Sequence, residues 1–324
     1  MSLDEFVLIE RIARRTHARD DIALGIGDDA ALLRPAADQQ LAVTADTLNA
    51  GVHFPAESAP ADIGWKALAV NLSDLAAMGA APAWCTLSLS LPQAEAAWLD
   101  PFADGLFALA DASGIAVVGG DTTRGPLSIS ITAMGQVPAG QALRRDGARV
   151  GDDIWISGHP GEAAGALRLW QQGRLDVRHA AADAAHERLR QRLQRPAPRL
   201  ELGLALRGLA HAAADVSDGL LADLGHLAAC SGVAAVVQAD AMPLSPALRA
   251  ALGFDAALDC ALRGGDDYEL CFTAAPERRE ALGALSSSLA LPLTRVGVIA
   301  EGRGVHCEGD AGDGRASGYR HFAE

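Results

Sequence analysis

Apolar and polar residues alternate along several segments of the first half of the chain, as they do in β-strands. These segments cover residues 41–44, 86–91, 115–118 and 127–132, and in the last of them Leu127, Ile129 and Ile131 alternate with polar residues. Apolar residues also recur at helical spacing over residues 62–79, where Asp62 is suited to be the N-cap, and over about 95–113. The pattern predicts an α+β N-terminal half.

A turn-rich stretch follows at residues 137–152, where glycine, proline and aspartate are frequent. Beyond it we expect a strand at 153–157, helices at about 162–172, 180–193, 200–211 and 219–230, and strands near 234–237, 268–273 and 295–299. We therefore predict two domains, residues 1–138 and a second, α/β domain over residues 149–324. The basic run of Arg188, Arg190, Arg192 and Arg195 is typical of a solvated helix face.

An uncharged stretch at residues 75–92 is almost long enough to span a bilayer. Gly79 and Pro82 interrupt it, and residues 86–91 alternate with strand period, so we expect a helix end, a turn and a strand. Residues 1–10 lack a basic segment that leads into an apolar run, unlike a signal peptide. We expect a soluble, cytoplasmic protein.

Composition narrows the class of function. With 324 residues, 50% of them hydrophobic, the chain is large and apolar enough for two domains. A formal charge of −14 argues against nucleic-acid or anionic-membrane partners, which basic surfaces bind. Because of this negative charge, an anionic ligand would need help from a metal. The five cysteines form no C-x-x-C pair and the histidines no ligand pair, which disfavours zinc and redox sites.

Residues 25–30, Gly-Ile-Gly-Asp-Asp-Ala, match the dinucleotide pattern G-x-G-x-x-A. That match is misleading, because Asp28 and Asp29 would repel a pyrophosphate and Pro35 would end any following helix early. The glycines instead allow the aspartates to turn toward a metal. A plain surface turn is the alternative.

Other aspartates occur in comparable positions. Asp46 follows an apolar strand, Asp121 follows Gly119 and Gly120, and Asp74 lies in a mostly apolar helix where a carboxylate needs a partner. In the second half, the acids precede a helix or a strand: Asp215, Asp218 (which could also be an N-cap) and Asp266.

Each aspartate has a structural alternative, but their recurrence favours Mg²⁺ shared with nucleotide phosphates. The chain contains no G-x-x-x-x-G-K-[ST], protein-kinase or G-x-S-x-G motif.

Six segments in order along the chain together resemble the thiamine-monophosphate kinase family: residues 25–30, 44–47, 66–79, 119–122, 215–220 and 318–322. That family belongs to the superfamily of aminoimidazole ribonucleotide synthetase and selenophosphate synthetase. The resemblance implies an α+β fold with two domains: an N-terminal α+β domain that binds ATP and Mg²⁺ and dimerises through its sheet, and a C-terminal α/β domain.

The resemblance also implies residue roles. The metal-binding set would be Asp29, Thr44, Ala45 through its backbone, Asp46, Asp74, Asp121, Asp215 and Asp218. ATP would be bound by Gly120, Asp121, Arg145 and Ser217, and thiamine monophosphate by His53, Asp266 and Tyr319. Asp74, Asp121 and Arg145 would be catalytic. The chain departs from its relatives at Ala45, where they often have a hydroxyl residue, and at Asp266, where they usually have glutamate.

The predicted activity is therefore the Mg²⁺-dependent, direct transfer of a phosphoryl group from ATP to thiamine monophosphate, by a homodimer. Two alternatives remain open. The first is a sister ATP-dependent synthetase, although the first cysteine is Cys85, whereas a selenophosphate synthetase would need a reactive cysteine or its selenium analogue near the N-terminus. The second is a catalytically silent nucleotide or thiamine-phosphate binder, which the departures at Ala45 and Asp266 would suit.

Overall fold

The computed structural model describes residues 5–310, and the chain divides into two compact units. Unit 1 consists of Met1–Leu75 and Ala80–Gly140, and unit 2 of Ala76–Gly79 and Gln141–Glu324. Across residues 5–310, no helix combines the length and the apolar character needed to cross a membrane.

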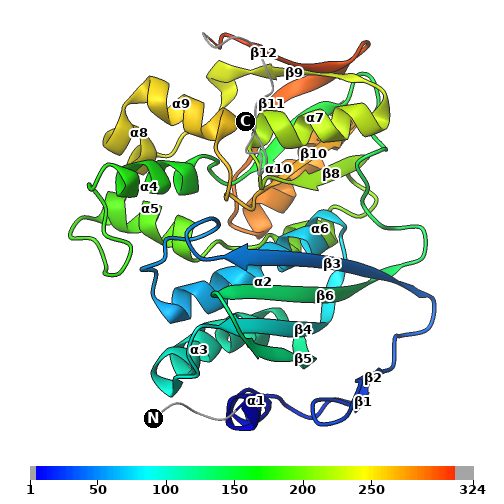
Figure 1. The fold of residues 1–324 in the computed structure, drawn as a ribbon. Helices are drawn as coiled ribbons and strands as arrows, with labels where there is room; N and C mark the ends of the chain where they lie inside the picture. Colours follow the sequence, from blue (N-terminus) through cyan, green and yellow to red (C-terminus); the bar gives the residue numbers. More distant parts are fainter. Residues whose placement is uncertain (1–4, 311–324) are drawn as a thin grey trace. The chain divides into compact units, whose positions relative to one another are not determined.

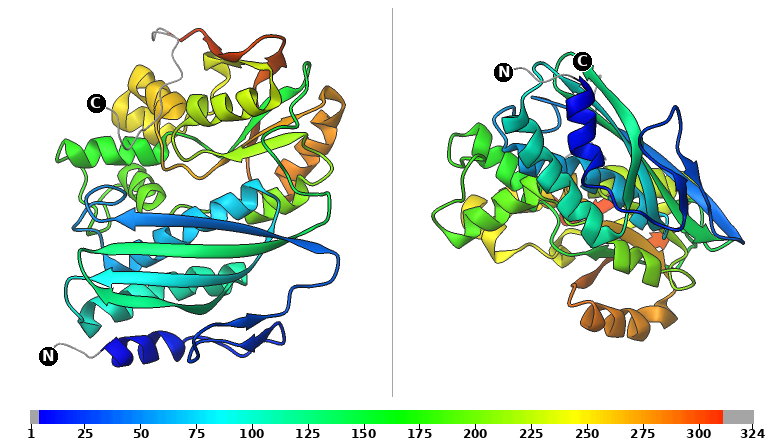
Figure 2. Two further views of the ribbon diagram at one scale, coloured as in Figure 1. Left: turned by 45° about the vertical axis from the view of Figure 1, so that its right-hand side comes forward. Right: turned by 90° about the horizontal axis from the view of Figure 1, so that it is seen from below.

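Unit 1 is built on a four-stranded sheet with the order β3-β6-β4-β5. The strands are β3 (Gln39–Asn49), β4 (Ala81–Leu91), β5 (Ala116–Arg124) and β6 (Ser128–Pro138). β6 is antiparallel to both of its neighbours, whereas β5 is parallel to β4. Figure 1 shows α2 (Pro60–Ala77) and α3 (Ala96–Ser113) behind this sheet. Beyond β5 lie α1 (Glu5–Ala13) and the short pair β1 (Ile22–Leu24) and β2 (Leu32–Leu33), drawn in blue in Figure 2.

The strands of unit 1 extend further than hydrophobic alternation predicted. β3 pairs with β6 from Gln39↔Pro138 to Asn49↔Ser128, so Asp46 lies inside a strand and not at its end. Asp121 likewise lies within β5. The polar residues are accommodated because pairing satisfies their backbone groups. Asp62 was expected to cap its helix, but α2 already begins at Pro60, which places Asp62 in the first turn.

Two glycines allow α2 and α3 to pack closely. A Cβ atom at Gly105 would lie 1.8 Å from the Ala61 carbonyl oxygen, and one at Gly64 would lie 2.0 Å from the Phe102 carbonyl oxygen. Backbone therefore contacts backbone at this crossing, and only glycine fits at both positions.

Unit 2 contains a six-stranded sheet with the order β12-β9-β11-β7-β10-β8. Its strands are β7 (Asp153–Ser157), β8 (Ala212–Asp215), β9 (Ala234–Gln238), β10 (Leu270–Ala274), β11 (Leu293–Ala300) and β12 (Gly304–Glu308). All neighbours are antiparallel except β12 and β9, which are parallel.

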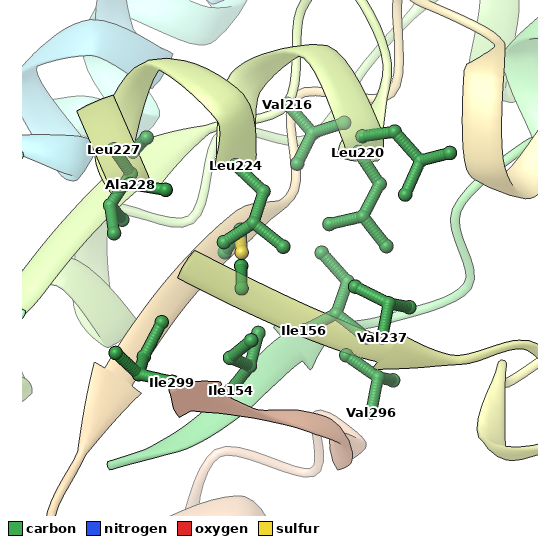
Figure 3. Packing of buried hydrophobic residues seen from close by; sticks show 14 of the residues in the cluster. Ile154, Ile156, Val216, Leu220, Leu224, Leu227, Ala228, Val237, Val296 and Ile299 are labelled. Carbon is green, nitrogen blue, oxygen red and sulfur yellow. The ribbon is translucent and has the colours of Figure 1, made fainter. Parts of the chain in front are cut away.

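One face of the unit 2 sheet is covered by α7 (Leu220–Ser231). Leu220, Leu224 and Leu227 of this helix pack toward Ile154 and Ile156 of β7, as Figure 3 shows. The opposite face contributes Trp155, Phe272 and their neighbours, which pack with α6 (Leu200–Ala205) and α10 (Arg279–Ser288). Successive residues of β7 thus alternate between two apolar cores.

The other helices of unit 2 form a group of their own: α4 (Glu162–Gln171), α5 (Ala184–Gln194), α8 (Pro246–Leu252) and α9 (Phe254–Arg263). Two short 3₁₀ turns complete the unit, η1 (Ala239–Ala241) and η2 (Pro276–Arg278). The helix expected at 200–211 ends at Ala205, and the alanine-rich β8 that follows was not predicted, because alanine carries little strand signal.

The interpretation of the basic run on α5 as a solvated face is wrong for Arg192, whose side chain is 22% exposed, whereas Arg188 is 47% exposed. Arg188 and Arg192 both bind Glu162, which is 1% exposed, and Arg192 also binds Glu269, again 1% exposed. A spacing of four residues places the two guanidinium groups on the side of the helix that faces Glu162.

Candidate functional site

A polar cluster in unit 1 joins β3 to α2. The hydroxyl of Thr44 donates a hydrogen bond to Oδ2 of Asp74, and the backbone N–H of Asp46 donates to Oδ1 of Asn71 at 3.1 Å. Alternation along β3 turns Thr44 and Asp46 toward the helix, while Asn71 and Asp74 lie on the same face of α2 three residues apart. The sequence named Thr44, Asp46 and Asp74, but it gave no role to the fully buried Asn71.

The two carboxylates of this cluster influence each other. Burial, reinforced by the charge of Asp74, raises the pKa of Asp46 to about 6. A cation bound by both carboxylates would relieve this unfavourable interaction, and hard oxygen donors of this kind suit Mg²⁺. Ala45 is exposed on the other face of β3, so its side chain lies outside the cluster.

Gly120 and Asp121 line a small cavity of about 60 Å³. Its wall is formed by Gly119–Thr122 of β5 together with Leu87 of β4, Ile9 and Ile12 of α1, and Ile26. Gly120 has φ 149°, and a Cβ atom there would lie 1.8 Å from the Leu87 carbonyl oxygen. The missing side chain at Gly120 therefore allows β5 to lie close to the backbone of β4 at this point.

The segment of residues 25–30 meets this cavity only through Ile26. Asp29 is exposed, and its backbone N–H donates to Oδ1 of Asp28 at 2.8 Å.

In unit 2, two turns that are distant in sequence lie side by side. The first is residues 215–219 and the second residues 264–269. The backbone N–H of Asp266 donates to the carbonyl of Ser217, and that of Tyr268 donates to the carbonyl of Val216, both at 2.9 Å. Four predicted site residues are thereby brought together: Asp215, Ser217, Asp218 and Asp266.

Asp223 supports the first of these turns, and the sequence gave no role to it. Its Oδ2 accepts hydrogen bonds from the backbone N–H groups of Ser217 and Asp218, each at 3.0 Å. Burial, with a smaller effect of the Asp218 charge, raises the pKa of Asp223 to about 6, while the N–H donors and the charge of Arg145 lower it. The backbone carbonyl of Arg145, a predicted ATP ligand, accepts a hydrogen bond from the Ser231 hydroxyl at 2.8 Å, at the C-terminal end of α7. The signal for Asp223 was an acid in the first turn of α7, close to the N–H groups of the turn that precedes the helix. Asp218, for its part, is not the N-cap, which is Gly219.

The three predicted substrate residues lie in different parts of the chain. Asp266 belongs to unit 2, where its Oδ1 accepts a hydrogen bond from the Tyr268 hydroxyl at 3.0 Å. His53 belongs to unit 1, and its Nδ1 accepts from the backbone N–H of Asn49 at 3.0 Å. Tyr319 lies outside the described residues.

Within residues 5–310, no three His, Cys, Asp or Glu side chains are grouped so that they alone could hold a metal ion. Mg²⁺ does not require such a group, since it is commonly bound by one or two carboxylates together with water and substrate phosphates. The Asp46–Asp74 pair with Thr44 fits that requirement.

Family comparisons cover both halves of the chain. Residues 27–137 match the AIR synthase related protein, N-terminal domain, and residues 149–309 match the AIR synthase related protein, C-terminal domain. The predicted two-domain fold of this superfamily is therefore confirmed.

Individual relatives match over the full length. The thiamine-monophosphate kinases of Salmonella typhimurium and Escherichia coli K12 are 47% and 46% identical, over 100% of this chain and 99% of theirs. A crystal structure of thiamine-monophosphate kinase from Stenotrophomonas maltophilia is 68% identical, with a TM-score of 0.91, over 96% of this chain and 99% of that one.

A structure of AaThiL complexed with AMPPCP and TMP is 32% identical, with a TM-score of 0.79, over 99% of both chains. With both domains and the full length matched, the chain belongs to the thiamine-monophosphate kinase family, built from the two AIR synthase related domains.

Proposed function

We propose that this protein transfers the γ-phosphoryl group of ATP to thiamine monophosphate, giving thiamine diphosphate. The observation that carries this proposal is the full-length match to kinases of this specificity at 46–47% identity. Further support is a relative, matched over 99% of both chains, that binds AMPPCP, an ATP analogue, together with TMP.

The acceptor group is a phosphate monoester, whose second pKa of about 6 leaves it mostly dianionic at neutral pH. It therefore needs no general base, and the main obstacle is repulsion between two anions. We infer a direct, in-line transfer without a phosphorylated protein intermediate. Arg145 supplies a fixed positive charge, while Gly120 and Asp121 position the nucleotide.

Mg²⁺ would be held by Asp46 and Asp74, with Thr44 orienting Asp74 through its hydrogen bond. Bound there, the ion would neutralise phosphate charge. Asp29, Asp121, Asp215 and Asp218 would bind or support further Mg²⁺ ions, and the phosphates themselves would supply further oxygen ligands.

We also propose that the protein forms a homodimer through the unit 1 sheet and that it is cytoplasmic. Support for the dimer is the apolar character of the exposed face of β3, where Leu41 is 47% and Val43 60% exposed. On β6, Met134 pairs with Val43 and extends this apolar face. Exposed apolar patches of this kind mark protein interfaces.

The decisive experiment measures ADP formation with thiamine monophosphate, free thiamine and a purine ribonucleotide precursor side by side. ADP release with thiamine monophosphate alone is expected. Activity only with free thiamine or only with the purine precursor would overturn the substrate assignment, and binding without ADP release would favour a silent binding protein.

A variant tests the metal pair. Asp74→Asn keeps the size of the side chain but removes half of the paired charge, so we expect turnover to fall by about 100-fold or more with the fold retained. The control is Asp111→Asn, which changes an exposed aspartate of α3 and should leave turnover unchanged. Loss of the folded state with Asp74→Asn would instead indicate a structural role.

A further inference from the structure

The turn at residues 264–269, which links α9 to β10, adopts an unusual backbone conformation. Asp266 has φ 68° and Tyr268 has φ 51°, both in the left-handed region that residues other than glycine rarely adopt. Such conformations persist only where the surroundings enforce them, and they cluster at functional sites.

Residues of the turn alternate between two directions. Asp267 and Glu269 point into unit 2, where Asp267 is 8% and Glu269 1% exposed. Oδ2 of Asp267 accepts a hydrogen bond from the backbone N–H of Gly161 at 2.6 Å, just ahead of α4. These two buried acids fix the turn to the rest of unit 2.

Glu269 is the stronger anchor. Its carboxylate accepts from Nε of Arg199 at 2.6 Å, from a terminal nitrogen of Arg192 at 2.9 Å and from the Ser157 hydroxyl at 2.5 Å. A second nitrogen of Arg199 binds the other carboxylate oxygen, which makes this pair bidentate. Multiple charge-assisted hydrogen bonds of this geometry fix the direction of a side chain.

The other two residues of this stretch, Asp266 and Tyr268, contact each other. The Tyr268 hydroxyl donates to Oδ1 of Asp266 at 3.0 Å, and the tyrosine side chain is itself only 9% exposed. A buried ring therefore sets the position of the hydroxyl, and the hydroxyl sets the orientation of the partly exposed carboxylate.

The geometry points to Tyr268 as a positioning residue for Asp266, which it orients to hold the cationic thiazolium ring of the acceptor substrate. This inference rests on the proposed function. A carboxylate suits a ring with a permanent positive charge, and a hydrogen bond from a neutral hydroxyl orients the carboxylate without cancelling its charge.

The test compares steady-state kinetics of the wild type and Tyr268→Phe. This substitution removes the hydroxyl and keeps the ring. We expect the KM for thiamine monophosphate to rise by about tenfold, with the KM for ATP and the thermal midpoint little changed. An unchanged KM for thiamine monophosphate, or an equal rise in both KM values, would overturn the inference.

A double-mutant cycle shows whether Tyr268 acts through Asp266. Asp266→Gly is a suitable background, because glycine adopts φ 68° without strain and carries no carboxylate. Adding Tyr268→Phe to Asp266→Gly should then produce no further rise in KM. Additive effects would show that Tyr268 acts independently and would reject the positioning role.

The wild-type reaction separates this inference from the proposed function. If the wild-type protein does not release ADP with thiamine monophosphate, the proposed function fails, and the inference fails with it. If the wild type is active and the cycle is additive, only the inference fails.

Discussion

Gly119 and Gly120 are adjacent in β5 but have different steric surroundings. A Cβ atom at Gly120 would lie 1.8 Å from the Leu87 carbonyl oxygen, whereas one at Gly119 would have only a methyl group of Thr86 at 3.9 Å. Gly120 also has φ 149°. The requirement for glycine is therefore specific to position 120.

We expect Gly120→Ala to lower the free energy of unfolding by about 2–4 kcal/mol, because backbone must move and the conformation is strained. Gly119→Ala, its matched control, should change stability by less than about 1 kcal/mol. Urea denaturation of both variants measures these changes in the free energy of unfolding. Equal losses would contradict the steric explanation.

Asp223 is the second residue whose role depends on tertiary structure. Asp223→Ala would remove the acceptor of the Ser217 and Asp218 N–H groups and should cost about 1–3 kcal/mol in unfolding free energy, together with a higher KM for ATP. Asp223→Asn keeps an oxygen acceptor and should recover most of both losses. Equal behaviour of the two variants, measured by denaturation and kinetics, would argue against this role.

At the scale of elements, the crossing of α2 and α3 depends on glycine. Gly105→Ala would place a Cβ atom 1.8 Å from the Ala61 carbonyl oxygen, so the helices would have to separate. We expect a loss of about 2–4 kcal/mol in unfolding free energy.

The control for this crossing is Gly283→Ala in α10. Nothing lies within 4 Å of a Cβ atom there, so the better helix propensity of alanine should raise stability by about 0.5–1 kcal/mol. Thermal or urea unfolding distinguishes the two. A stable Gly105→Ala protein would show that α2 and α3 can repack.

At the scale of the whole molecule, the proposed homodimer requires the exposed sheet face of unit 1. Val43→Glu places a charge on that face and should convert a particle of about twice 33.4 kDa into a monomer, as measured by light scattering. Val150→Glu alters an equally accessible valine of unit 2, 55% exposed, and should leave the mass unchanged. A wild-type monomer at micromolar concentration would refute the dimer.

The sequence by itself determined those elements whose periodicity is clear. β7 was predicted residue for residue, and residues 75–92 were correctly divided into a helix end, a turn and a strand. The ordered glycine and aspartate segments were sufficient to identify the family. These features depend on local periodicity and on residue types, which a sequence contains directly.

Only the tertiary structure decided the full extent of the strands and the contacts between residues that are distant in the sequence. The tertiary structure extended β3 past Asp46 and turned Arg188 and Arg192 toward Glu162. It placed the Asp223 carboxylate where it accepts a hydrogen bond from the backbone N–H of Ser217. It also brought the turn that holds Asp266 beside the one that holds Asp218. The physical reason is common to all of them: strand pairing, burial of charge and steric contact join residues far apart in the chain, and local pattern contains no record of those partners.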